Sequence, residues 1–456
     1  MYLFIHRKDL RASDLPAFTH MSQHRAPSIH LFILDENLLD DGRHDEPSGR
    51  AFLQRLEALE HQYDYYGKTL HILQGDVNRI IETIKKHHNI HELVYHTDST
   101  PYAHKRDLAM NETARQLGLH VRAFDDLSLV HPRAFQRFSG KPDTYKVFTP
   151  FYRKWSDFLQ LHPPVVYNES IADLDVHELN EVIRSQFAAN PQIYPVAEHR
   201  KLALAADAPR KKIATFLETQ VEHYKEARDF YHYDSTSRIS LFLNTGAISA
   251  REVYETALIE RVSGSDAWIR QLAWRDFYIY QSVMTPDYFA FENNYDFSLL
   301  SDEHYERWAC GETGIPIIDA AMRELNETGH MHNRLRMVTA MFLTKNLLCP
   351  FTLGERHFRR KLLDYDNALN RGGWLWSSSL GYDGAPYFRV MNPVTQSQRF
   401  DVQGQYLRKW LPELRHLSQE QIHLEQANAL VDLKESRQRS IDTYKVILEK
   451  AKNSAP

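Results

Sequence analysis

Two carboxylates, an amide, a pair of glycines and two tryptophans fall between Asp364 and Trp376. The carboxylates could act as an acid and a base or as metal ligands. Equally, they could accept hydrogen bonds from ribose hydroxyls, or form an ion pair with Arg336. The adjacent glycines, Gly372 and Gly373, allow another group to approach the backbone closely. This composition is unlike that of a core segment, so we expect a binding site here.

A second set of polar side chains is expected on a helix over 331–347. Asn333, Arg336 and Met337 stand at i, i+3 and i+4, which places an amide, a cation and a thioether on one face. Arg334 faces elsewhere and could meet a phosphate. An amphipathic helix with surface arginines would produce the same pattern.

The stretch from Trp268 to Tyr278 is also expected to be helical. Its Trp268, Gln271 and either Trp274 or Arg275 share a face with Tyr278. Rings, an amide and a guanidinium on one face can line a pocket for a flat ligand with polar edges. Aromatic core packing beside a partly buried arginine is the simpler interpretation of this stretch alone.

A run of five residues before another expected helix places hydroxyl groups around an arginine. Hydroxyls and backbone N–H groups beside a cation can bind a pyrophosphate. Helix capping by serine and threonine is the commoner reason for such a run. The five residues are Thr236, Ser237, Arg238, Ile239 and Ser240.

The elements that must position these groups differ between the two halves of the chain. Over residues 1–130, short apolar, β-prone runs alternate with helical patterns such as 49–63 and 77–88. This alternation predicts a Rossmann-like α/β domain with a parallel, doubly wound sheet, although no GxGxxG motif follows the first strand. The strands are expected at Tyr2–His6, Ser28–Leu34, Thr69–Gln74, His91–His96 and His120–Phe124.

Dense prolines over 131–200 predict a linker with short helices, and helical periodicity from 201 predicts an all-α domain over 201–456. Long loops are expected around Asn293 and Ser377. The polar tail over 418–452 is expected to be helical. The other helices are expected at 211–224, 250–262, 267–283, 315–327, 331–347 and 354–363.

The charge distribution permits an acidic partner in spite of a net charge of −5. The net charge alone argues mildly against nucleic acid. Residues 311–411, however, hold 13 Lys/Arg against 9 Asp/Glu. The histidines, including the pairs His330/His332 and His87/His88, lack cysteines or carboxylates at metal-site spacing, so no metal is expected.

Nothing in the composition indicates a membrane or secreted protein. No window has 18 consecutive apolar residues, and Met1–Arg11 is patterned as a strand, not as a signal peptide. The two cysteines, Cys310 and Cys349, suit a reducing compartment. We therefore expect a cytoplasmic protein, and we expect it to be a monomer.

Together these segments resemble the photolyase/cryptochrome family, most closely its class I cyclobutane pyrimidine dimer photolyases. The motifs follow in family order over residues 1–411, and the resemblance is most specific over 311–401. The matching segments are His6–Arg11, Tyr145–Phe151, Thr236–Ser240, Trp274–Tyr278, Gly311–Pro316, Asp319–Met322, Met331–Met337, Gly372–Trp374 and Ala385–Arg389.

The resemblance implies that the helical domain holds FAD folded into a U. It implies that Asp364 and Arg336 form an ion pair beside the isoalloxazine ring and that Asn370 faces flavin N5. An amide there can both donate and accept a hydrogen bond, so it tolerates more than one redox state of the flavin. The residues expected to bind FAD are Tyr224, Thr236, Ser237, Arg238, Ile239, Ser240, Trp268, Gln271, Arg275, Asn333, Arg336, Asp364, Asp366 and Asn370.

The same resemblance implies light-driven repair of DNA. Photoexcited reduced FAD would pass an electron to a flipped-out pyrimidine dimer and receive it back, so no general base or nucleophile is required. The residues expected to contact the reacting groups are Trp274, Asn333, Met337, Asn370, Trp374 and Trp376. Those expected to contact DNA are Arg228, Gln271, Trp274, Arg334, Met337, Trp376 and Arg399.

Gln271 departs from the pattern of the cyclobutane-dimer enzymes, which usually carry glutamate there, and matches the (6-4) photoproduct photolyases. Asn370 favours repair, because cryptochromes usually carry cysteine or aspartate at this position. The absence of histidine at Asn333 and Met337 favours cyclobutane dimers. A cryptochrome-type blue-light photoreceptor, a (6-4) photolyase and a flavin-bearing structural DNA binder are the alternatives.

The family has a chain of tryptophans that passes electrons to the flavin during photoreduction. In this sequence we expect that chain to be interrupted. Trp374 matches its flavin-proximal tryptophan, but the middle position is Phe351 and the distal position falls at Phe297 or Ser298. Since phenylalanine carries a hole poorly, we expect slow photoreduction or another route. The candidate substitutes are Tyr295, Tyr365 and Trp308.

The family also binds a second, antenna chromophore, for which the resemblance gives few matching positions. The positions that align with folate contacts are Thr100, Phe289 and Ala290, and His44 alone is retained. We expect no methenyltetrahydrofolate, but a deazaflavin or an empty site.

Overall fold

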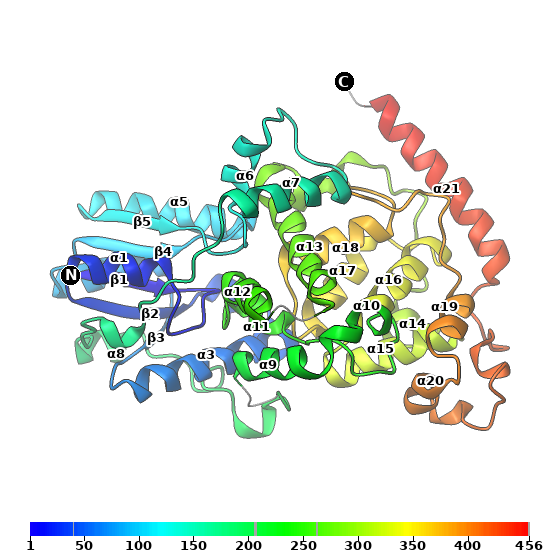
Figure 1. Ribbon diagram of the computed structural model, residues 1–456, viewed down its shortest axis with the longest axis horizontal. Coiled ribbons are helices and arrows are strands. Elements are labelled where there is room, and N and C mark those ends of the chain that lie inside the picture. Colours follow the sequence, from blue (N-terminus) through cyan, green and yellow to red (C-terminus); the bar gives the residue numbers. More distant parts are fainter. Residues whose placement is uncertain (40, 205–207, 261–262, 455–456) are drawn as a thin grey trace. The chain divides into compact units, whose positions relative to one another are not determined.

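The computed structural model describes residues 1–39, 41–204, 208–260 and 263–454 (Figure 1). They form two compact units. Unit 1 contains Met1–Asp143, Tyr152–Thr219 and Ser237–Met284, and unit 2 contains Thr144–Phe151, Gln220–Thr236 and Thr285–Pro456. This grouping by contacts differs from a division by chain order into 1–130, 131–200 and 201–456, which stays a prediction.

Unit 1 contains a five-stranded, wholly parallel sheet in the order β3-β2-β1-β4-β5 (Figure 1). The predicted α/β domain with a doubly wound sheet is confirmed. Three of the five predicted strands have the predicted bounds, and two begin one or two residues later. The strands are β1 (Tyr2–His6), β2 (Ser28–Leu34), β3 (His71–Gln74), β4 (Glu92–His96) and β5 (His120–Phe124).

Alternating residues of β1 build two separate cores, one on each face of the sheet. Tyr2 and Phe4 pack with helices α1 (Pro16–His24) and α3 (Pro47–Tyr65). Leu3 and Ile5 pack with α4 (Val77–His87) and α5 (Pro101–Gln116). A strand that is apolar on both sides is what a sheet covered by helices on both faces requires.

Side chains of unit 1 fill the carboxyl edge of β1 and β4, where doubly wound folds often bind nucleotides. The guanidinium of Arg7 donates to the carbonyl of His96 and to Asp107, each at 3.0 Å. Lys8 lies 3.4 Å from Asp98. These side chains fill the edge at which a doubly wound fold would hold a nucleotide, and the sequence has no GxGxxG motif after β1.

A buried polar network lies among the apolar residues of unit 1. Tyr63 lies between two imidazoles, with its hydroxyl 2.6 Å from Nε2 of His6 and 2.7 Å from Nδ1 of His30. Asp9 accepts from His6 at 3.2 Å and from His96 at 2.5 Å. Burial lowers the pKa of His30 well below its usual value, so this ring is neutral. The strand pattern did not predict these contacts.

The remaining elements of unit 1 are helices, of which α13 and the start of α11 carry candidate site residues. The prediction that helix 250–262 continues to Val262 falls partly outside the described residues. Helix α7 (Phe148–Leu161) begins in unit 2 and ends in unit 1. The others are α2 (Glu36–Leu39), η1 (Arg43–Asp45), α6 (Pro132–Ser139), η2 (Ile171–Asp173), α8 (Glu181–Gln186), η3 (Glu198–Arg200), α9 (Pro209–Thr219), α11 (Ser240–Thr245), α12 (Ala250–Glu260) and α13 (Ser265–Met284).

All the regular elements described in unit 2 are helices, joined by turns and loops. None of the described helices of the chain is long and apolar enough to cross a membrane. The elements of unit 2 are η4 (Val221–His223), α10 (Tyr224–Ala227), η5 (Tyr288–Asn294), α14 (Tyr305–Cys310), α15 (Pro316–Thr328), α16 (Asn333–Met341), η6 (Phe342–Asn346), α17 (Phe351–Lys361), α18 (Asn367–Ser377), α19 (Pro393–Phe400), α20 (Gln405–Trp410), η7 (Pro412–Leu414), η8 (Gln421–His423) and α21 (Leu433–Ser454).

Two helices of unit 2 differ from their predictions. The predicted helix over 331–347 is α-helical only to Met341 and continues as the π-helical turn η6. The predicted helix over 418–452 is wrong before Leu433, because Gln426 and Leu430 donate backbone hydrogen bonds to residues 314 and 313, each at 2.9 Å. Bonds to a distant loop replace the bonds that a helix would make.

Candidate active site

The predicted ion pair of Arg336 and Asp364 is present in unit 2. Nη2 of Arg336 lies 2.9 and 3.0 Å from the two carboxylate oxygens of Asp364. Nε of Arg336 donates to the carbonyl of Met331 at 2.9 Å, which fixes the guanidinium plane. His332 caps α16 by accepting from the backbone of Arg334. The cap fixes the start of the helix that carries Arg336. The side chains are 26% and 12% exposed, so the pair is only partly screened by water.

Helix α18 carries Asn370 and the glycine pair. Asp366 is its N-cap and accepts from the backbone of Ala368 and Leu369 at 2.9 and 3.0 Å. One carboxylate oxygen of this predicted cofactor ligand is therefore used to cap the helix. Asn370 donates its amide to the carbonyl of Glu355 at 3.1 Å. This bond orients the Asn370 side chain.

The face of α18 around Gly373 is open. A Cβ built on Gly373 would meet no atom within 4 Å, and the residue is exposed. Gly373 stands three residues after Asn370, so both lie on one helix face. A flat ring system could therefore approach the backbone beside an oriented amide. The Arg336 guanidinium, the Asn370 amide and the open helix face fit an isoalloxazine ring.

A buried arginine lies between two carboxylates behind this face. Arg371 lies 2.8 Å from Glu355 and 2.6 Å from Glu292, and it also donates to the carbonyl of Phe289 at 3.2 Å. Burial raises the pKa of the Glu355 carboxyl to about 7, with Glu292 adding to the rise and Arg371 opposing it. Sequence reasoning missed Glu292 and Glu355, because they lie 79 and 16 residues from Arg371 and carry no motif.

Glu355 is expected to make the stability of the protein depend on pH. Its pKa is raised from 4.5 to about 7 in the folded state, so the folded state binds this proton more tightly than the unfolded state. The free energy of unfolding should therefore fall as pH rises from about 4.5 to about 7, by on the order of 3 kcal/mol from this group. Glu355→Gln should flatten this slope in denaturant titrations. The same slope in the variant would show that another group titrates.

The predicted lesion-pocket residues of unit 2 fall on two helices. Asn333 and Met337 are in contact on α16, with 3.9 Å between Nδ2 and Sδ. Trp376 is half-buried near the end of α18. The guanidinium of Arg334, also on α16, lies 2.7 Å from Asp229 and is therefore already ion-paired.

The other arginines expected to contact DNA also lie in unit 2. Arg228 lies over the ring of Tyr224 at 5.8 Å, and burial raises the pKa of that phenol. Arg399 is exposed on α19 and lies over Phe400 at 5.1 Å. Thr236 is half-buried in the loop that ends this part of unit 2.

Trp374 is packed so tightly that its ring position is fixed. A Cβ on Gly354 would lie 2.1 Å from Cη2 of Trp374 and 2.7 Å from Cδ2 of Leu343. The ring also contacts Phe358 at 5.0 Å between centroids. Glycine at this position of α17 is required for the approach of the indole.

Unit 1 brings two predicted cofactor ligands together. The indole of Trp268 donates to the hydroxyl of Ser237 at 3.1 Å. Arg238 has a φ of +50°, in the left-handed region, and Ile239 is buried before α11 begins at Ser240. The run of hydroxyls therefore leads into a helix, as predicted.

The other predicted residues of α13 make contacts inside unit 1. Gln271 donates to the carbonyl of Ala267 at 3.0 Å, and Arg275 donates to the carbonyl of Leu127 at 2.6 Å. Trp274 stacks on Tyr278 with 6.0 Å between ring centroids. The bond to Leu127 fixes the guanidinium of Arg275 inside this unit.

Two of the positions aligned with folate contacts make local contacts in unit 1. Thr100 caps α5 by accepting from the backbone of Ala103 at 3.2 Å. His44 lies 3.6 Å from Asp45. Among the described residues, no three histidines, cysteines or carboxylates are placed to hold a metal ion.

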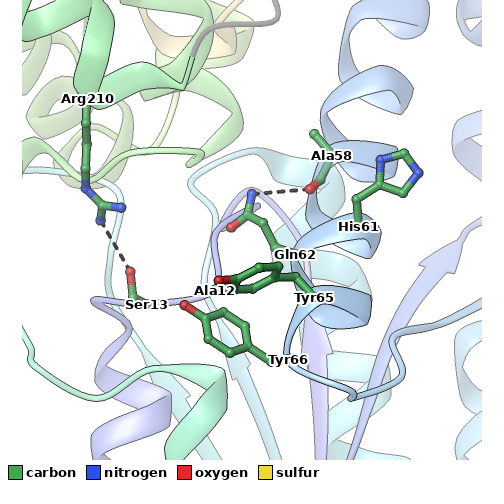
Figure 2. Close-up of a pocket in the computed structure, with 8 residues that line it drawn as sticks. All are labelled: Ala12, Ser13, Ala58, His61, Gln62, Tyr65, Tyr66 and Arg210. Carbon is green, nitrogen blue, oxygen red and sulfur yellow. Dashed lines mark hydrogen bonds between the residues drawn. The ribbon is translucent and has the colours of Figure 1, made fainter.

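A pocket of about 350 Å³ lies on unit 1, and none of its lining residues is a predicted site residue (Figure 2). Arg210 in its wall contacts Glu252 at 2.9 Å and Ser13 at 3.3 Å, and Gln62 donates to the carbonyl of Ala58 at 3.3 Å. The polar groups of Arg210, Ser13 and Gln62 thus already have partners. The lining residues are Ala12, Ser13, Ala58, His61, Gln62, Tyr65, Tyr66 and Arg210.

Comparison with known proteins decides the family. A model of the FAD binding domain of DNA photolyase matches residues 268–454, and a model of DNA photolyase matches residues 2–167. A deoxyribodipyrimidine photo-lyase of Alkalihalophilus pseudofirmus is 33% identical over 430 residues, which cover 91% of this chain and 88% of that protein. The chain belongs to the photolyase/cryptochrome family. A Vibrio cholerae deoxyribodipyrimidine photo-lyase is 34% identical over 471 residues, 98% of this photolyase-family chain and 99% of the relative.

Solved structures agree with this family assignment. A bacterial class III photolyase from Agrobacterium tumefaciens has a TM-score of 0.83 and 27% identity, covering 98% of each chain. An archaeal photolyase from Sulfolobus tokodaii, solved with two FAD molecules, has a TM-score of 0.81 and 26% identity, covering 98% of this chain and all of the other. A Synechocystis cryptochrome has a TM-score of 0.81 at 24% identity, covers 97% of this chain and 98% of its own, and shows the fold alone.

Proposed function

We propose that this protein repairs cyclobutane pyrimidine dimers in DNA with light, using reduced FAD. The observation that carries the proposal is the Arg336–Asp364 pair together with an oriented Asn370 on the open face of α18. Relatives at 33–34% identity over most of the chain are named deoxyribodipyrimidine photo-lyase. When bound, photoexcited reduced FAD supplies the electron that splits the dimer.

The side chains of unit 2 would hold and orient the reacting partners. The Arg336–Asp364 pair would place fixed charges beside the ring, and Asn370 would offer an amide to its polar edge. Met337 and Trp376 offer a thioether and an indole to a base turned out of the duplex. Because the electron returns, these residues need no acid or base role.

Further observations separate this function from its alternatives. Asn370 favours repair over signalling, and the absence of histidine at Asn333 and Met337 favours cyclobutane dimers, whereas the (6-4) alternative rests on Gln271 alone. In the structure Gln271 bonds to its own helix, to the carbonyl of Ala267. The cryptochrome alternative has a neighbour in fold, but at an identity too low to indicate function.

Trp376→Ala is expected to weaken binding of dimer-containing DNA by roughly 10- to 100-fold, because stacking on an aromatic ring contributes about 1–3 kcal/mol per base. Binding of undamaged DNA of the same sequence should change little. Asn333→Ala should act in the same direction. The measurement is the Kd of each duplex by fluorescence anisotropy over a series of salt concentrations.

Arg399→Ala is the matched control for general DNA binding. Arg399 is exposed, so a phosphate contact would be lost from both duplexes equally, and the salt slope would fall by about one. Equal losses on both duplexes for Trp376→Ala would remove Trp376 from the lesion pocket. Preference for a (6-4) duplex over a cyclobutane duplex would favour the (6-4) alternative.

The antenna, the oligomeric state and the location stay predictions. Thr100 uses its hydroxyl as a helix cap, which supports the absence of methenyltetrahydrofolate. A deazaflavin or an empty site remains the expectation, and the two FAD molecules belong to the archaeal structure. We likewise propose a cytoplasmic monomer.

A further inference from the structure

Three oxidisable rings form a row in unit 2. Trp374 and Trp308 have ring centroids 6.1 Å apart, and Trp308 and Tyr305 have centroids 6.3 Å apart. Trp374 and Trp308 are 1% and 0% exposed, whereas Tyr305 on α14 is half-buried. The row therefore leads from the core of the unit to its surface.

The position that aligns with the middle tryptophan of the family leads to a poorer route. Phe351 contacts Phe297 with 6.2 Å between centroids, and the guanidinium of Arg371 lies 5.4 Å from the Phe351 ring. A benzene ring is much harder to oxidise than an indole, and a neighbouring cation opposes a positive charge on it further. Tyr295 stacks on Phe297 at 6.0 Å, so a route outward from Phe351 to Tyr295 passes through two phenylalanines.

Hydrogen bonding makes oxidation of the outer indole, Trp308, easier than oxidation of the inner one, Trp374. The indole N–H of Trp308 donates to the carbonyl of Thr339 at 3.1 Å. The indole N–H of Trp374 has no hydrogen-bond partner among the described residues. Donation to a carbonyl strengthens when the donor becomes positive, so it stabilises an oxidised Trp308 relative to an oxidised Trp374. A hole formed on Trp374 would therefore move outward.

We propose that Trp308 and Tyr305 are the electron relay that refills Trp374 when the flavin is photoreduced. The proposal rests on the function proposed above. Trp374 gives one electron to the flavin, Trp308 gives one to Trp374, and Tyr305 gives one to Trp308. Tyr305 loses its phenolic proton to water and becomes a neutral radical. An external thiol returns a hydrogen atom to Tyr305, and two thiyl radicals combine as a disulfide.

The test compares two half-buried tyrosines, Tyr305 and Tyr295, each changed to phenylalanine. Each substitution removes one hydroxyl and keeps the ring. The FAD-loaded protein is illuminated with blue light without DNA and with a thiol, and the flavin spectrum is followed. Tyr305→Phe should slow photoreduction by about tenfold or more and abolish the tyrosyl signal in transient absorption and electron paramagnetic resonance. Tyr295→Phe should behave like the unaltered protein.

Three outcomes would overturn the relay. These are an unaltered tyrosyl signal in Tyr305→Phe, a loss of that signal in Tyr295→Phe, and fast photoreduction in Trp308→Phe with a native melting curve. Dimer repair by dithionite-reduced protein is measured separately. Absence of repair by the unaltered protein would contradict the proposed function. Slow photoreduction of Tyr305→Phe, with intact repair after chemical reduction of the same variant, would support the relay.

Discussion

Asp364→Asn is expected to remove most FAD from the purified protein. The variant keeps the shape of the side chain but loses the charge that pairs with Arg336 at 2.9 and 3.0 Å. Leaving a partly buried guanidinium without its partner should lower the free energy of unfolding by about 2 kcal/mol. We expect the Kd for FAD to rise roughly 30- to 100-fold, about 2–3 kcal/mol. Fluorescence titration of the apoprotein with FAD measures the change.

Arg336→Lys is the matched control for the geometry of this pair. Lysine keeps the positive charge but cannot bond to the carbonyl of Met331 and to Asp364 in one plane. Its effect on the Kd should therefore lie between that of the unaltered protein and Asp364→Asn. The double variant should lose less than the sum of the two single changes. Additive losses would show that the two residues act independently.

Asp276→Ala should be among the most destabilising changes in unit 1. Its buried carboxylate accepts from the backbone of Leu129 and Val130 at 3.0 and 2.9 Å, and from the indole of Trp155 at 2.9 Å. Burial raises the pKa of Asp276 to about 6. Alanine would leave three buried donors without an acceptor, so we expect a loss of about 3–5 kcal/mol in chemical denaturation.

Trp155→Phe is the comparison for this cluster. It removes one of the three donors and keeps an aromatic ring, so the expected loss is smaller than for Asp276→Ala. A change at Asp276 that matched the change at Trp155 would mean that the two backbone bonds contribute nothing. In that case the segment that contains Leu129 and Val130 is held by its apolar packing.

The sheet could be predicted from sequence because its signal is local. Tyr2–His6 and Ser28–Leu34 are continuous apolar, β-prone runs that are buried on both faces, and nothing nearby competes with a strand. The tail could not be predicted in the same way. Its residues Gln426 and Leu430 form backbone bonds with residues 314 and 313, more than 100 positions away, which local periodicity does not reveal.

The candidate site was predictable where spacing along a helix determines position. Asn333 and Met337 meet because four residues make about one turn, and Arg336 was expected to pair with Asp364. The pairing of Arg371 with Glu355 was not predictable, because it depends on how α17 and α18 pack, and that packing leaves no fixed spacing in the sequence. The cap by Asp366 is instead a local contact with the next turn, and the resemblance had assigned this carboxylate to the cofactor.

The repair reaction itself tests the central claim most directly. FAD-loaded protein, reduced with dithionite, is mixed with dimer-containing oligothymidylate and illuminated with blue light, and absorbance near the thymine maximum is followed. We predict recovery of absorbance in the light, none in the dark, and little with Asp364→Asn at the same protein concentration. No light-dependent recovery with full FAD occupancy and measurable DNA binding would contradict the proposed function.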